Sequence, residues 1–192
     1  RRKNLGDGKD AERPDPNNLM EFLYTLSTRT KSMLLATATP VQLRPVEAWD
    51  LLSILGKGSD AVLGSVWSNW QRADQGLGLV LGSLEPPQDD FDRWQWIREP
   101  LPPASEHRDF EILRRALGQT KVQVMASGGD WERLGAPDKS RVRGMFPRFM
   151  EQHNPFIRNI VRLSRKYLEE TIDPATGEPY LKPILVELLG ER

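Results

Sequence analysis

The sequence has 192 residues, with 27 Lys or Arg and 27 Asp or Glu, so the formal net charge is zero. This length suits one or two small domains with a buried core, and the balanced charge means that any DNA-binding surface must be local. Cysteine is absent, which excludes disulfides and thiolate metal sites. With only two histidines in the chain, we expect no metal site.

No apolar run approaches the roughly 20 residues that a membrane span requires, so we expect no membrane contact. The lack of cysteine suits a reducing compartment, and we expect a cytoplasmic protein. The sequence starts with Arg1-Arg2 and has no apolar secretory segment, so we expect a piece of a longer protein.

The first 56 residues predict half of a doubly wound α/β unit. Residues 1–16 are polar and predict a loop, and apolar residues at helical spacing predict a helix from about 17 to 28. The short apolar run 31–37 predicts a buried strand of a parallel sheet. Thr37-Ala38-Thr39-Pro40 comes next, and then a helix that begins near Pro45 and ends at Gly56.

Residues 59–152 contain no convincing strand and predict short helices separated by prolines. Ser59 and Ser105 are expected to cap two of these helices. Tryptophans recur at helical spacing with other apolar residues, which favours core packing over stacking on nucleic-acid bases. The expected core tryptophans are Trp49, Trp67, Trp70 and Trp94. Trp131 comes after two glycines and an aspartate and is expected to lie in an exposed loop.

The last section predicts a helix, a turn and a strand. Asn154 and Pro155 begin a helix that continues to about residue 170, residues 173–179 predict a turn, and residues 180–188 predict a strand. Four basic residues share one flank of this helix: Arg158, Arg162, Arg165 and Lys166. They form either a basic ridge that contacts phosphates or an ordinary solvated face paired with nearby glutamates.

Three features, in this order, resemble Swi/Snf-type ATPases of helicase superfamily two, in particular the bacterial RapA-like branch. The run from Met33 to Leu43, which contains Thr37-Ala38-Thr39-Pro40, is similar to the third helicase motif. Residues 47–52, Glu-Ala-Trp-Asp-Leu-Leu, resemble the helix that these enzymes carry just downstream. Residues 156–168 are similar to the arginine-rich segment that closes the first RecA-like lobe. Arg1-Arg2 are similar to the basic residues directly after the Asp-Glu-Ala-His box of the family.

This resemblance implies an α/β fold, a partial RecA-like lobe with an incomplete parallel sheet and a large, mainly α-helical insertion. The expected domains are the C-terminal half of the lobe at 1–57, the helical insertion at 58–153, and the helix and strand that close the lobe at 154–192. The resemblance also implies a parent that uses ATP and Mg²⁺ to move along double-stranded DNA. The insertion would then contact DNA or a protein partner.

The resemblance implies a coupling motif that links the ATP state to DNA movement, made of Thr37, Ala38, Thr39, Pro40 and Gln42. The alternative is that the two threonines only satisfy backbone groups at the end of a strand. The chain has no Gly-x-x-x-x-Gly-Lys phosphate loop and no acidic box for Mg²⁺, so we expect no catalysis and no bound ATP in this chain alone. A second hypothesis is a mostly helical module that binds proteins or nucleic acids without enzymatic activity.

Overall fold

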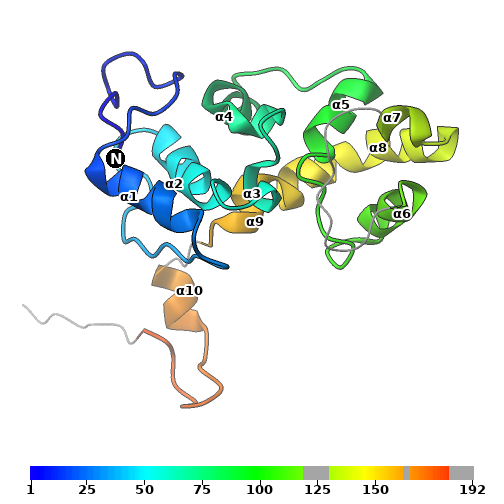
Figure 1. The fold of residues 1–192 in the computed structure, drawn as a ribbon. Coiled ribbons are helices and arrows are strands. Elements are labelled where there is room, and N and C mark those ends of the chain that lie inside the picture. The colour runs from blue at the N-terminus through cyan, green and yellow to red at the C-terminus, as the bar shows by residue number, and fades with distance from the viewer. Residues whose placement is uncertain (119–129, 162–164, 182–192) are drawn as a thin grey trace, which may run out of the picture. The chain divides into compact units, whose positions relative to one another are not determined.

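A computed structural model describes residues 1–118, 130–161 and 165–181 of the chain (Figure 1). The chain divides into two compact units, Arg1–Asn159 and Ile160–Arg192, each of which is described by itself. The first unit therefore unites residues of the expected segments 1–57 and 58–153 in one body. Among the described helices, none is both long and apolar enough to cross a membrane.

The first unit consists of helices and the loops that join them (Figure 1). In chain order these are α1 (Asn18–Ser27), α2 (Val46–Gly56), α3 (Asp60–Leu63), the 3-10 turn η1 (Asn69–Gln71), α4 (Ala73–Leu81), α5 (Asp90–Ile97), α6 (Arg108–Ala116), α7 (Asp130–Arg133), α8 (Ala136–Arg148), the π-helical turn η2 (Phe149–His153) and α9 (Pro155–Asn159). Helix α2 packs against α1, α3, α4 and α9, which makes it the central element of this unit.

Side chains in front of several helices accept hydrogen bonds from N–H groups of the first turn, which have no partner inside the helix. The Asn17 side chain does this for α1 at 2.9 Å, the Ser59 hydroxyl for α3 at 3.2 Å, and the Asn154 side chain for α9 at 2.9 Å. The predicted caps at Ser59 and Asn154 are thus confirmed. The prediction for Ser105 is wrong, because the His107 ring caps α6.

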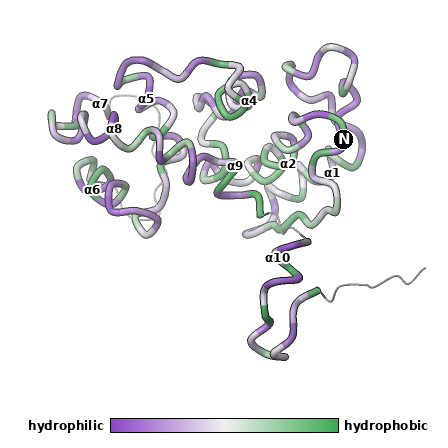
Figure 2. The backbone as a smooth tube through the Cα atoms, turned by 180° about the vertical axis from the view of Figure 1, so that it is seen from behind, coloured by the Kyte–Doolittle hydropathy of each residue, from purple (hydrophilic) through white to green (hydrophobic). Residues whose placement is uncertain are grey.

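The core of the first unit is centred on tryptophans from three different segments. The indole N–H of Trp49 donates to the backbone carbonyl of Trp70 at 2.9 Å. The indole N–H of Trp70 in turn donates to the backbone carbonyl of Trp96 at 3.0 Å. The rings of Trp70 and Trp96 meet edge to face with centroids 4.7 Å apart. These contacts tie α2, η1 and α5 together, and Figure 2 shows hydrophobic stretches on α2 and α9 in the same region.

Core packing is confirmed for Trp49, Trp70 and Trp94 but is wrong for Trp67, whose side chain is 74% exposed. The apolar spacing predicted one helix from Ser59 through Trp67 to Trp70, whereas α3 ends at Leu63. The next residue, Gly64, has φ +79°, a conformation that a helix cannot continue through. Trp131 lies half-buried in α7 rather than in an exposed loop.

The predicted α/β fold is wrong, because the described residues are helical and contain no strand. Residues 31–37 are neither helix nor strand, although their burial alternates: Met33 and Leu35 are half-buried and Leu34 is 92% exposed. A strand requires a neighbour for its backbone hydrogen bonds. Within the part of the chain that the structure describes, residues 31–38 form no backbone–backbone hydrogen bond, so no sheet is built on them.

The second unit contains α10 (Arg165–Glu170) followed by a hairpin-like turn. The N–H of Asp173 donates to the carbonyl of Glu178 at 2.8 Å, and an isolated antiparallel bridge joins Ile172 to Pro179. The turn predicted at 173–179 is confirmed. The single helix predicted from 154 to 170 is wrong, because residues 160–161 are not helical. Of the strand predicted at 180–188, residues 182–188 lie outside the described part of the chain.

Candidate functional site at the start of helix α2

The segment Thr37–Arg44 leads into α2 and contains all the residues of the predicted coupling motif. Thr37, Ala38 and Thr39 are exposed, and the Thr37 hydroxyl accepts a hydrogen bond from the N–H of Thr39 at 3.2 Å. This local bond is a common turn contact of a threonine and needs no strand. The two threonines therefore lie at the surface in a tight turn.

Glu47, in the first turn of α2, fixes the base of this segment. One carboxylate oxygen, Oε2, accepts hydrogen bonds from the N–H groups of Gln42, Leu43 and Arg44 at 2.9, 2.6 and 3.1 Å. The other, Oε1, lies 3.0 Å from Nε of Arg1. A carboxylate is well suited to this place, because it accepts several N–H bonds and also favours the helix N-terminus.

The environment of Glu47 favours its charged form. Burial by itself raises the pKa of this carboxyl group, but the hydrogen bonds from Leu43, Arg44 and Gln42 and the charge of Arg1 outweigh burial. The pKa of Glu47 is therefore lowered from its ordinary value. The ionised side chain and the segment 42–44 thus stabilise one another.

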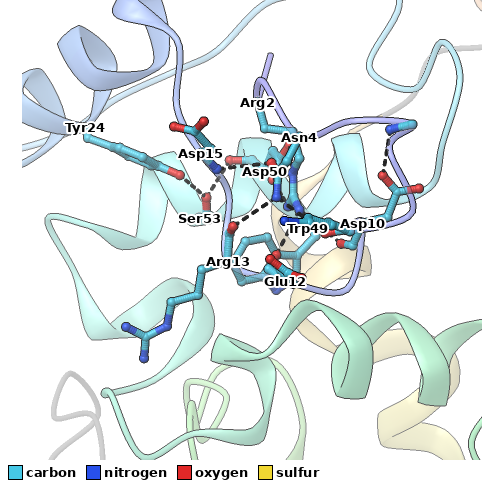
Figure 3. Close-up of polar contacts among 12 residues, drawn as sticks. Arg2, Asn4, Asp10, Glu12, Arg13, Asp15, Tyr24, Trp49, Asp50 and Ser53 are labelled. Carbon is cyan, nitrogen blue, oxygen red and sulfur yellow. Dashed lines mark hydrogen bonds and ion pairs between the residues drawn. The ribbon is translucent and has the colours of Figure 1, made fainter.

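A second ion pair joins the N-terminal segment to α2 one turn further on (Figure 3). Nε of Arg2 donates to both carboxylate oxygens of Asp50 at 3.1 and 3.0 Å, and Nη2 also contacts this carboxylate. Nη1 of Arg2 donates to the carbonyls of Asp10 and Glu12, both at 3.0 Å. Arg2 is 3% exposed and Asp50 is 5% exposed. One buried guanidinium therefore closes the loop of residues 1–16 and fastens it to α2.

A short chain of hydroxyl groups extends this network to α1 (Figure 3). The Ser53 hydroxyl donates to the carbonyl of Asp50 at 2.8 Å and lies 3.0 Å from the Tyr24 hydroxyl. Burial raises the pKa of Asp50, although Arg2 opposes this shift through its hydrogen bond and charge. Burial also raises the pKa of Tyr24, against the effect of the Ser53 hydrogen bond. These groups hold α1, α2 and the N-terminal loop together.

The exposed threonines border a pocket of about 260 Å³ between α1, α2 and the N-terminal segment. Apolar side chains of α1 and α2 form much of its wall, and charged groups lie at its Arg1 side. The lining residues are Arg1, Leu19, Met20, Leu23, Thr37, Thr39, Pro40, Glu47, Asp50, Leu51 and Ile54. Thr37 and Thr39 therefore face a real hollow.

The charged side chains of this site are paired with one another. In the described part of the chain, no three His, Asp or Glu side chains gather as a cation site. The arginine at the pocket, Arg1, is already paired with Glu47, and Arg2 is taken up by Asp50.

The predicted basic residues do not share one helix in the described part of the chain, and they belong to two different units. Arg158, in α9, is bound to Glu106 through a 2.8 Å contact. Lys166, in α10, belongs to the second unit and lies 3.8 Å from Glu170. Arg162 and the side chain of Arg165 lie outside the described part of the chain. The single helix expected to carry all four residues is interrupted at residues 160–161, and the basic ridge itself stays a prediction.

Sequence reasoning identified the segment 37–42 but missed the acidic groups that hold it. Glu47 and Asp50 are three residues apart, so on a helix they lie one above the other on the same side. Arg1 and Arg2 are adjacent, and each pairs with one of these carboxylates. The two acidic residues on one side of α2 and the two adjacent arginines were visible in the sequence. That they form two ion pairs could not be predicted without knowing that the N-terminal segment lies against α2.

Comparison with protein families, with curated proteins and with solved structures gives no match to this chain.

Proposed function

We propose that this chain is part of an ATP-dependent DNA translocase, in which the segment Thr37–Arg44 relays movement between the nucleotide-binding part of the protein and DNA. The nucleotide is bound by residues outside this chain. The observation that carries the proposal is the construction of the segment. Its threonine tip is exposed beside a pocket, while its base is fixed to α2 by Glu47. A relay needs both a free contact surface and a rigid attachment.

The resemblance to the third helicase motif supports the same role for Thr37 and Thr39. Hydroxyl groups can exchange hydrogen-bond partners at little cost, because each one both donates and accepts. Such groups at an exposed tip can respond to a change in the part of the protein that they touch. Gln42 belongs to the fixed base, since its N–H is bound by Glu47.

The test uses the complete protein that contains this chain. Changing Thr37→Ala and Thr39→Ala together is expected to leave ATP hydrolysis measurable but to reduce translocation along duplex DNA, followed by displacement of a third strand. Thr25→Ala is the matched control, because its hydroxyl bonds to the carbonyl of Glu21 within α1 and is not part of the pocket. Equal displacement rates in the double variant, the control and the wild type would remove the relay role.

A second candidate function, a helical interaction module, is favoured by one surface feature. Val66 and Trp67 occupy the tip of the turn Ser65–Ser68 and are 82% and 74% exposed. The turn is held rigidly, since the hydroxyl of Ser68 donates to the carbonyl of Glu99 at 2.6 Å. A preorganised tryptophan at the surface is typical of protein-binding hot spots. If the complete protein lacks DNA-stimulated ATP hydrolysis, the translocase proposal is rejected and the interaction module is the function that we propose.

A further inference from the structure

We infer that Glu47 is a positioning residue through which the contact of Arg1 controls how firmly the segment Thr37–Arg44 is held. The inference deepens the proposed function and rests on it for its consequence in DNA movement. Its structural part, the link from Arg1 through Glu47 to the N–H groups of residues 42–44, can be tested without any activity.

The two carboxylate oxygens of Glu47 have different partners. Oε2 is used entirely for the backbone of residues 42–44, and Oε1 is used for Arg1. The Glu47 side chain is largely buried whereas the Arg1 side chain is 45% exposed, so solvent screens the ion pair more than the contacts with the backbone. A change in the contact of Arg1 therefore alters the charge balance of the same carboxylate that holds residues 42–44.

The two adjacent arginines differ in how firmly they are held. Arg2 is buried and makes hydrogen bonds to Asp50 and to two backbone carbonyls, so it is an anchor. The Arg1 side chain is 45% exposed and makes an ion pair with Glu47. An exposed side chain next to a fixed residue can change its contact at low cost, whereas Arg2 cannot. Arg1 is thus the adjustable member of the pair.

Single substitutions separate the two halves of the link. Arg1→Gln removes the ion pair and leaves the Glu47 carboxylate in place. Glu47→Gln keeps an oxygen that can accept from the N–H groups, but it removes the charge. Glu47→Ala removes both contacts. Lys3→Gln is the matched control, because it also removes one cation of the N-terminal loop, and Lys3 pairs with Asp15 of the same loop at 3.6 Å.

The experiment measures hydrogen exchange of the peptide covering residues 40–46 in the complete protein. Glu47→Ala is expected to speed exchange at least about tenfold, because hydrogen bonds to a charged group are lost. Arg1→Gln and Glu47→Gln are expected to speed it by about two- to fivefold, since the bonds remain but lose their charge balance or strength. Lys3→Gln should match the wild type. Wild-type exchange in Arg1→Gln overturns the inference, because a merely structural Glu47 would not respond to Arg1.

A second readout is the number of base pairs moved per ATP hydrolysed. Arg1→Gln and Glu47→Gln are expected to lower this ratio at least twofold, while Lys3→Gln leaves it unchanged. If exchange responds to Arg1 but the ratio does not, the link exists without coupling and the inference fails in its functional part. If the wild-type protein does not move on DNA at all, the proposed function fails, and the exchange result alone then decides the structural link.

Discussion

Replacing Arg2 by Met is expected to destabilise the first unit strongly, because it leaves a buried carboxylate without its partner. Arg2 and Asp50 are 3% and 5% exposed, and removing one member of such a pair typically costs about 3–5 kcal/mol. The carbonyls of Asp10 and Glu12 lose a donor as well, which adds about 0.5–1.5 kcal/mol each where they stay buried. The free energy of unfolding from urea titration at pH 7 measures the total.

The pH dependence of the same variant provides an internal check. Burial already raises the pKa of Asp50, and loss of Arg2 raises it further. An acid whose pKa is higher in the folded state binds protons more readily there, so stability falls as pH rises from the ordinary Asp range through the raised pKa. The destabilisation caused by Arg2→Met should therefore shrink between pH 7 and pH 4. A loss of less than about 1 kcal/mol at pH 7, independent of pH, would refute this account of the ion pair.

Three further predictions use the same urea titrations. The pKa of Glu47 is lowered in the folded state, so its charged form stabilises the fold above the ordinary Glu pKa, and this stability is lost as pH falls through the lowered pKa. Glu47→Gln should therefore destabilise the protein at pH 7 and differ less from the wild type near pH 3. Trp70→Phe should cost about 2–4 kcal/mol through a cavity and a lost hydrogen bond, against less than about 0.5 kcal/mol for the exposed Trp67→Phe. Gly64→Ala should cost more than about 2 kcal/mol, because φ is +79° and a Cβ would lie 2.7 Å from a backbone carbonyl oxygen. Gly82 has a similar φ of +74° but open space around it, so Gly82→Ala should cost about 1 kcal/mol. A reversed order within either matched pair would contradict the packing described above.

Two helix caps and one turn were predicted correctly from local features of the sequence. The caps at Ser59 and Asn154 and the turn at 173–179 depend on side chains that bond to the backbone a few residues away, so their pattern is visible in one dimension. The run 31–37 has the composition of a buried strand, but composition does not supply the neighbouring backbone that a strand needs. Its failure to form a sheet is a matter of long-range partners, which spacing alone does not reveal.

The site was only half predictable for a related reason. Thr37 and Thr39 were found through a contiguous motif, and the structure puts both at one pocket. The contacts of Arg2 with Asp50 join residues 48 positions apart, and nothing in either local sequence demands them. The basic ridge required a helix to continue through residues 160–161, where the chain leaves helical geometry. The sequence therefore indicated the exposed part of the candidate site, but not the ion pairs that hold it in place.

The six-residue motif of α2 makes physical sense once its partners are known. Glu47 binds the segment 42–44, Trp49 donates to the carbonyl of Trp70, Asp50 holds Arg2, and Leu52 is fully buried. Successive residues of a helix point in directions about 100° apart, so this short helical motif contacts several segments at once. The motif thus specifies a junction of the N-terminal loop, the threonine segment and the helices after residue 59.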